Sequence, residues 1–172
     1  NVLAGGEFED MADFGGGAVT SAGNFDAFVA SYTPAGAYRW SKTFGASQSD
    51  TVDSVAVDGS GNVVTGGGFH NTVMFGTTSL TSSGVIDGWF AVLDGTTGAP
   101  KWAKKLGASQ SGVVRDVAAD AQGNVIVSGD LEGTANLGTG ALAPLGVYDI
   151  FLAGFDQTAG TALFAKRYGG TD

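Results

Sequence analysis

The segment NVLAGGEF at residues 1–8 decides the fold, because it returns as NVVTGGGF at 62–69 and as NVIVSGDL at 124–131. The copies start 61 and 62 residues apart, and the similarity continues through the length of each copy. Self-similarity at a fixed period indicates a repeat architecture, so it sets the organisation of the chain before any local prediction. We call residues at the same repeat position equivalent. The equivalent sets include Gly15, Gly76 and Gly138; Asp26, Asp87 and Asp149; Trp40, Trp102 and Phe164; and Lys42, Lys104 and Lys166.

The repeats divide the chain into units 1–61, 62–123 and 124–172. The first unit begins at its Asn, which follows DGSG or DAQG in the other two, and the third stops before its equivalent of DSVAVDGSG. We therefore expect three repeats of one domain, the third incomplete, in a fragment of a longer protein.

Each unit contains four candidate strands. The first is the NVVTG type, the second is DAFVASY or its equivalents, the third is AYRWSKTFG, and the fourth is DSVAVD or RDVAAD. Enrichment in β-branched and aromatic residues between glycine-containing turns is typical of strands. A glycine-rich connection before the second strand has room for a short extra strand. No segment has a helical apolar period, so we expect almost no helix.

The second strand is apolar on both faces, which favours a place inside a stack of sheets. Four antiparallel strands per repeat, packed face to face, describe the blades of a β-propeller. A parallel β-helix has shorter coils than 62 residues, and a β-sandwich does not require the recurring register. The predicted fold is thus an all-β propeller of four-stranded blades, about three 62-residue repeats forming part of a larger propeller. Fewer than three complete repeats do not close a usual ring, so either more blades lie outside this fragment, or several chains assemble one ring, or the blades stack openly, and we favour the first. We expect Trp40 and Trp102 to be buried between consecutive sheets.

The runs SVAVDGSGNVVTGGGF at 54–69, LTSSGVIDGWFAVLD at 80–94 and KWAKKLGAS at 101–109 resemble the bacterial β-propeller repeat known as SBBP. The resemblance covers essentially the whole chain, whereas its VD-x-x-GNV element is shared with NHL-type propellers. It implies a propeller within a large secreted or surface-exposed bacterial protein, and it implies no agreed activity. The third copy departs from the pattern at Ala143-Pro144 and at Phe164.

Composition excludes several classes of function. The net charge of −9 disfavours nucleic acid and anionic lipid as partners. No apolar run approaches the roughly 20 residues that span a bilayer. The absence of cysteine excludes disulfides and thiolate metal sites, and a single histidine, His70, disfavours zinc sites and histidine-based triads. No D-x-D-x-D-G calcium loop or phosphate-binding glycine loop is present. We expect no cofactor, and a location outside the cell or on its surface.

The recurring polar residues are the only candidate site positions. Asp26, Asp87 and Asp149 could line a channel and bind a cation, but an aspartate before a strand commonly accepts backbone N–H groups in its own turn. Lys42, Lys104 and Lys166 could meet an acidic ligand, but a lysine at a sheet edge commonly pairs with a carboxylate and hinders aggregation. For both sets we favour the structural interpretation. The recurring tryptophans are interpreted as core rather than as sugar platforms, and His70 as a solvated loop residue.

The favoured function is a non-catalytic extracellular module for surface scaffolding, adhesion or protein contact. Two alternatives stay open: a glycan-binding propeller, and an enzyme whose site is completed by missing blades. The connections share few polar residues, which disfavours a glycan site in every repeat. Function is expected where the copies differ, chiefly at residues 7–14, 68–75 and 130–137.

Overall fold

A computed structural model describes residues 1–171, which form an all-β, antiparallel structure. The first sheet contains β1 (Val2–Asp13), β2 (Ala18–Tyr32) and β3 (Tyr38–Phe44). The middle sheet has the order β4 (Ser54–Val57), β5 (Val63–Phe69), β8 (Asp87–Leu93) and β9 (Pro100–Lys105). The third sheet has the order β10 (Ser111–Ala119), β11 (Val125–Glu132), β14 (Asp149–Phe155) and β15 (Ala162–Tyr168).

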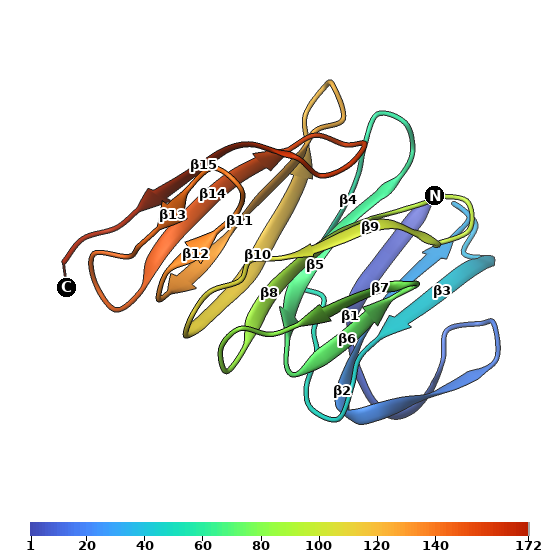
Figure 1. Ribbon diagram of the computed structural model, residues 1–172. Coiled ribbons are helices and arrows are strands. Elements are labelled where there is room, and N and C mark those ends of the chain that lie inside the picture. The colour runs from blue at the N-terminus through green and yellow to red at the C-terminus, as the bar shows by residue number, and fades with distance from the viewer. Residues whose placement is uncertain (172) are drawn as a thin grey trace.

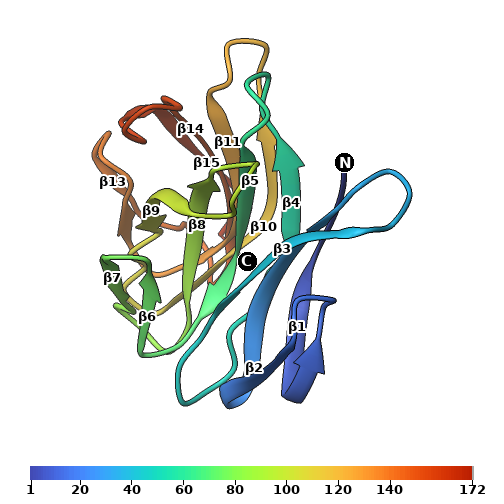
Figure 2. The same cartoon turned by 90° about the vertical axis from the view of Figure 1, so that its right-hand side faces the viewer.

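The sheets lie side by side in chain order, from the first sheet in blue to the third in orange and red (Figure 1). Two of them have the four strands expected from the sequence, but the first has three. Within the described residues, no strand of the first sheet occupies the place that β4 and β10 occupy in the others. Figure 2 shows the same stack turned by 90°, with β1 and β2 at one side of it.

The middle and third sheets each combine strands from two consecutive sequence repeats. β4 comes from the first repeat unit but pairs with β5 of the second, and β10 pairs with β11 of the third in the same way. The cause is local, because tight turns at 58–62 and 120–124 fold these strand pairs into hairpins. The boundaries expected at 61/62 and 123/124 therefore fall inside sheets rather than between them.

Short hairpins form in the glycine-rich connection before the second strand of the second and third repeats. β6 (Thr72–Phe75) pairs with β7 (Thr78–Thr81), and β12 (Ala135–Asn136) pairs with β13 (Ala141–Leu142). In the first sheet the same connection is an extension of β1 and β2. The expected extra strand is thus a pair of strands. The bend before each hairpin has a positive φ at equivalent residues, Asp10, Asn71 and Gly133.

Two apolar cores hold the sheets together. The first joint, between the first and middle sheets, buries Phe44, Phe75 and Trp89, and the Phe44 and Phe75 rings stack with centroids 4.6 Å apart. The second joint, between the middle and third sheets, buries Leu106 and Leu137 at the equivalents of Phe44 and Phe75. Every residue of β5 and of β8 is buried, as expected for strands covered on both faces.

A tryptophan crosses each joint. The Trp40 indole donates a hydrogen bond to the Gly95 carbonyl in the next sheet (3.2 Å), and its ring lies against Gly98. Trp102 repeats the contact with the Gln157 carbonyl (2.9 Å) and Gly160. Trp40 is buried, as predicted, whereas Trp102 is half-buried on the edge of the second joint.

Candidate functional site

The recurring aspartates are buried acceptors for backbone N–H groups. Each accepts a bond from the residue four positions before it: Ala22 N to Asp26 (3.0 Å), Ser83 N to Asp87 (3.1 Å) and Leu145 N to Asp149 (2.9 Å). This is the turn geometry favoured from the sequence.

The remaining contacts of the Asp87 and Asp149 carboxylates differ. Asp87 Oδ1 accepts bonds from Gly107 N (2.8 Å) and Ala108 N (3.3 Å), which ties the turn to the end of β9. Asp149 Oδ2, the oxygen that accepts the Leu145 N–H, also accepts a bond from the Arg167 guanidinium (2.7 Å). Burial raises the pKa of Asp87 above its ordinary value, whereas the bond from Arg167 lowers the pKa of Asp149. Equivalent carboxylates are thus tuned in opposite directions.

Asp26 differs because a second carboxylate competes for its donor. Ala46 N, the equivalent of Ala108 N, donates to Asp50 (2.8 Å) instead. Asp50 also accepts a bond from His70 N (2.9 Å), and its burial raises its pKa. Asp26 Oδ1 is left buried without a hydrogen-bond partner among residues 1–171, as is Asp149 Oδ1 in the third sheet.

The aspartates of the GNV turns are structural as well. Asp58 accepts bonds from Ser60 N (2.9 Å), Asn62 N (2.8 Å) and the Asn62 side-chain amide (2.7 Å). Asp120 makes the equivalent bonds with Gln122 and Asn124, and the Asn124 amide lowers its pKa. These turns close the β4–β5 and β10–β11 hairpins.

The recurring lysines do not form the ion pairs expected of them. Lys42 and Lys104 are half-buried, Lys166 is exposed, and the ion pairs within residues 1–171 involve Arg115 and Arg167 only. Lys104 lies on the face that meets the next sheet, where its stem passes close to Gly160. Lys166 is exposed, and no described sheet lies beyond its own. It is the neighbouring Lys105 that anchors the β6–β7 hairpin, through the Thr81 carbonyl and the Ser83 hydroxyl (2.7 Å).

His70 and the remaining tryptophan also have structural places. His70 lies in the connection between β5 and β6, as expected, but it is half-buried rather than solvated, with Nδ1 against the Ser49 carbonyl. Trp89 is buried in the first joint and donates its indole N–H to the Thr51 carbonyl (3.1 Å).

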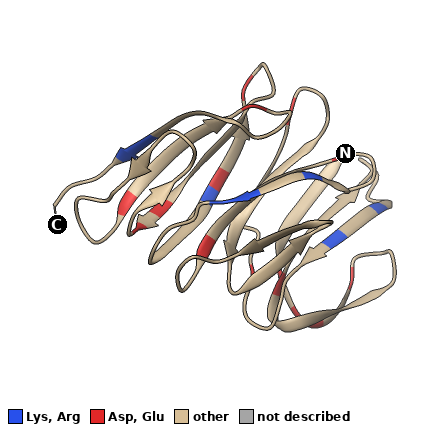
Figure 3. Ribbon diagram, viewed as in Figure 1, with Lys and Arg blue, Asp and Glu red and all other residues tan. Residues whose placement is uncertain are grey.

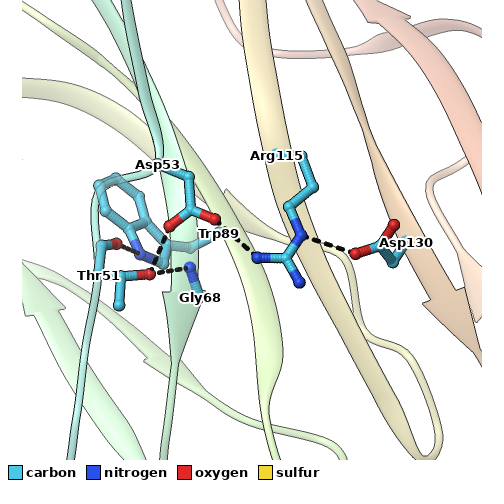
Figure 4. A network of polar contacts seen from close by, with 6 residues as sticks. All are labelled: Thr51, Asp53, Gly68, Trp89, Arg115 and Asp130. Atoms are coloured by element: carbon cyan, nitrogen blue, oxygen red, sulfur yellow. Dashed lines mark hydrogen bonds and ion pairs between the residues drawn. The ribbon is translucent and has the colours of Figure 1, made fainter.

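The clearest cluster of charged groups lies where the inner strands β4 and β10 run side by side, and we call it the inner seam (Figure 4). Arg115 bridges the sheets: its Nε donates to Asp130 (2.6 Å) and its terminal N–H donates to Asp53 (3.0 Å). Beside it, the Ser54 hydroxyl donates to Asp116 (2.7 Å). The hydrogen bond that Arg115 donates to Asp130 raises the pKa of Arg115, which keeps the guanidinium charged.

The inner seam is acidic overall, because it contains the carboxylates of Asp53, Asp116 and Asp130 and the single guanidinium of Arg115. The Arg115 side chain is 56% exposed and Asp130 is 45% exposed, so both can reach a ligand from solvent. Such a surface suits a cationic or hydrogen-bonding group on a protein partner. Within residues 1–171, no three Asp, Glu or His side chains are grouped closely enough to hold a metal ion.

Sequence reasoning missed the inner seam because it searched for residues that recur. Asp53 and Arg115 are equivalent to each other, as are Ser54 and Asp116, and each pair bonds across the joint. The available signal was a difference between copies, because the acidic Asp53 of one copy is replaced by the basic Arg115 at the same position of the next.

No protein-family model and no curated protein matches the sequence. Among solved structures, the crystal structure of BamB from Moraxella catarrhalis matches with 17% identity and a TM-score of 0.33. The match covers 99% of this chain and 55% of that one, so the chain spans about half the length of that structure. A likeness this distant carries no argument about function. None of the described residues forms a helix long and apolar enough to cross a bilayer.

Proposed function

We propose that the chain is a non-catalytic scaffold of β-propeller-type blades, exposed outside a bacterial cell or on its surface, that binds protein partners. The observation that carries the proposal is a difference in solvent exposure between recurring and variable residues. Several recurring residues, such as Asp87 and Trp40, are buried in turns and joints. Several polar residues that differ between copies, such as Arg115 in the inner seam, lie exposed. The resemblance to SBBP repeats supports the blade assignment and the location.

The hairpins supply a second exposed and variable surface. The chain has two methionines, and both lie on these connections: Met11 is 70% exposed and Met74 is 51% exposed. Exposed methionine is typical of surfaces that adapt to protein partners, because its side chain is flexible and polarizable. Carbohydrate recognition instead favours exposed aromatic rings beside polar groups, and the rings of Trp40 and Trp89 are buried.

The test is selection of peptide binders from a random displayed library on the immobilised chain. We expect selected peptides to bind the parent chain with micromolar affinity. Their affinity should fall about tenfold or more for the variant that combines Met11→Ser and Met74→Ser. Val57→Ser is the matched control, because Val57 is equally exposed but lies on β4. Peptides that bind the double variant and the parent chain equally would contradict the proposed surface.

A panel of bacterial oligosaccharides, assayed on the same immobilised chain, tests the main alternative function, which is glycan binding. We expect no saturable binding. Binding that the methionine substitutions abolish would replace the protein-binding proposal with a glycan-binding one.

A further inference from the structure

Each internal joint is formed by two different sheet faces, which we call its contributing and receiving halves. The same two kinds of face lie at the two ends of the stack, one on the third sheet and the other on the first. In the first joint, Phe44 of the first sheet, on the contributing half, meets strand residues of the next sheet such as Trp89, together with its β6–β7 hairpin. The second joint repeats this arrangement with Leu106 and Leu137. At the two ends of the stack, no further described sheet lies beyond the third sheet or beyond the first (Figure 1).

The third sheet presents the contributing half. Tyr168 is equivalent to Phe44 and Leu106, and it is 52% exposed, whereas they are 4% and 0% exposed. Ile150, which pairs with Tyr168 across the strands, is 58% exposed, whereas the equivalent Ala27 is fully buried.

The first sheet presents the receiving half. Phe14 is equivalent to Phe75, and its ring stacks on Phe28 with centroids 4.3 Å apart, as Phe75 packs on Trp89. Phe14 and Phe28 are half-buried, whereas Phe75 and Trp89 are each 1% exposed. The receiving turn contains Gly36, where a side chain would meet no heavy atom within 4 Å, although the equivalent Gly98 and Gly160 lie against Trp40 and Trp102.

The chemistry of these two halves is matched. The first joint stacks Phe44 on Phe75, and the corresponding residues of the outer faces, Tyr168 and Phe14, are also both aromatic. Charge agrees as well. Lys104 and Asn136 line one cavity in the second joint, and their equivalents on the outer faces are Lys166 and Asp13. Figure 3 shows basic residues on β15, at the open side of the third sheet.

We propose that, where no further blade covers these two faces, the third sheet of one 172-residue chain docks on the first sheet of a second copy, which extends the stack head to tail. Tyr168 then packs on Phe14 of the second copy, and Phe164 covers its Gly36 turn. Phenylalanine lacks the indole N–H, so this joint has one hydrogen bond fewer than the internal ones. The interface is heterologous, so each added copy leaves one face of each kind open. The docking uses sheet faces rather than the exposed methionines, so it does not depend on the partner proposed above.

The test is sedimentation velocity of the 172-residue chain from ~5 to ~500 µM, a range that brackets weak interfaces. We expect the weight-average mass to rise with concentration above the 17.2 kDa of one copy. Tyr168→Glu places a charge on the contributing face. Gly36→Asn places a side chain in the receiving turn, and Asn tolerates the positive φ of 82° found there. Each substitution should weaken association about tenfold or more.

Val85→Glu is the control, because Val85 is the most exposed apolar side chain and lies in the β7–β8 connection. An equimolar mixture of Tyr168→Glu and Gly36→Asn chains retains one intact joint, so it should form dimers and nothing larger. Thermal unfolding followed by circular dichroism establishes that each variant is folded. A parent chain that stays monomeric throughout, association unaffected by either substitution, or a mixture that stays monomeric would overturn the proposal.

Discussion

The first and second joints use the same positions with different chemistry. The first is aromatic, with Phe44, Phe75 and Trp89 in mutual contact. The second is mainly aliphatic at the matching positions and adds the ion pair of Arg115 with Asp53 between the inner strands. The difference shows that the repeat specifies where sheets meet, whereas the residues on both sides of each joint vary together.

The largest effect is expected from truncating the aromatic joint. Phe75→Ala removes a buried ring and should lower the free energy of unfolding by about 3–5 kcal/mol, against about 2–3 for Leu137→Ala in the second joint. Urea unfolding followed by circular dichroism measures both. Phe44→Leu combined with Phe75→Leu, which imitates the second joint, should cost less than Phe75→Ala. A larger cost for Leu137→Ala would show that the second joint dominates stability.

The next largest effect concerns the glycines under the tryptophans. A Cβ at Gly98 would lie 2.5 Å from the Trp40 ring, and φ there is 71°, so Gly98→Ala should cost about 2–3 kcal/mol. At Gly160 the closest atom is the flexible end of Lys104, so Gly160→Ala should cost less. Gly36→Ala, with open space around it, reports the backbone strain alone, about 1 kcal/mol. Equal losses of unfolding temperature in all three variants would rule out the ring contact as the cause.

A smaller effect is expected in the inner seam. Arg115→Met removes an exposed ion pair and leaves Asp53 and Asp130 close together, so it should cost about 0.5–1 kcal/mol at low salt. The loss should shrink in ~1 M NaCl, because salt screens exposed charges. Lys101→Met is the control, since Lys101 is exposed and bonds only to the Asn62 side chain (2.9 Å). A salt-independent loss would indicate packing by the arginine stem rather than charge.

The smallest effect expected is an opposite pH dependence of the contributions that Asp87 and Asp149 make to stability. The pKa of Asp87 is raised on folding, so its contribution to stability grows as pH falls through that raised value toward the ordinary 3.8. The pKa of Asp149 is lowered, so its contribution is present above 3.8 and is lost as pH falls through the lowered value. Relative to the parent chain, the deficit of Asp149→Asn should therefore shrink at low pH and that of Asp87→Asn should grow. Urea titrations between about pH 3 and pH 7 test the signs, and parallel slopes would contradict them.

The strands were predictable because their signals are local. Recurring glycines such as Gly98 marked the turns, and the β-branched and aromatic runs marked the strands that the structure contains. The pairing of β4 with β5 across a repeat boundary was not visible, since periodicity gives the length of a repeat but not its phase relative to a sheet. The bend at Asp10, Asn71 and Gly133 was hidden because three different residue types share one backbone conformation.

The candidate site was less predictable than the fold. Asp149 was correctly interpreted as a turn acceptor, but its bond to Arg167 depends on a residue found in one copy only. The inner seam depends on the alignment of β4 with β10, which is a tertiary relation between positions 62 residues apart. Side chains that differ between repeats carry no periodic signal, so their proximity is seen only in the folded structure.

The exposed methionines have a chemical consequence. The chain contains no cysteine, so its two sulfur atoms are those of Met11 and Met74. Peroxide can therefore oxidise sulfur only on the hairpins, where a thioether becomes a polar sulfoxide. Both joints are free of sulfur and keep their packing under such oxidation. Oxidative damage at sulfur would thus alter what the surface recognises while leaving the framework of sheets intact.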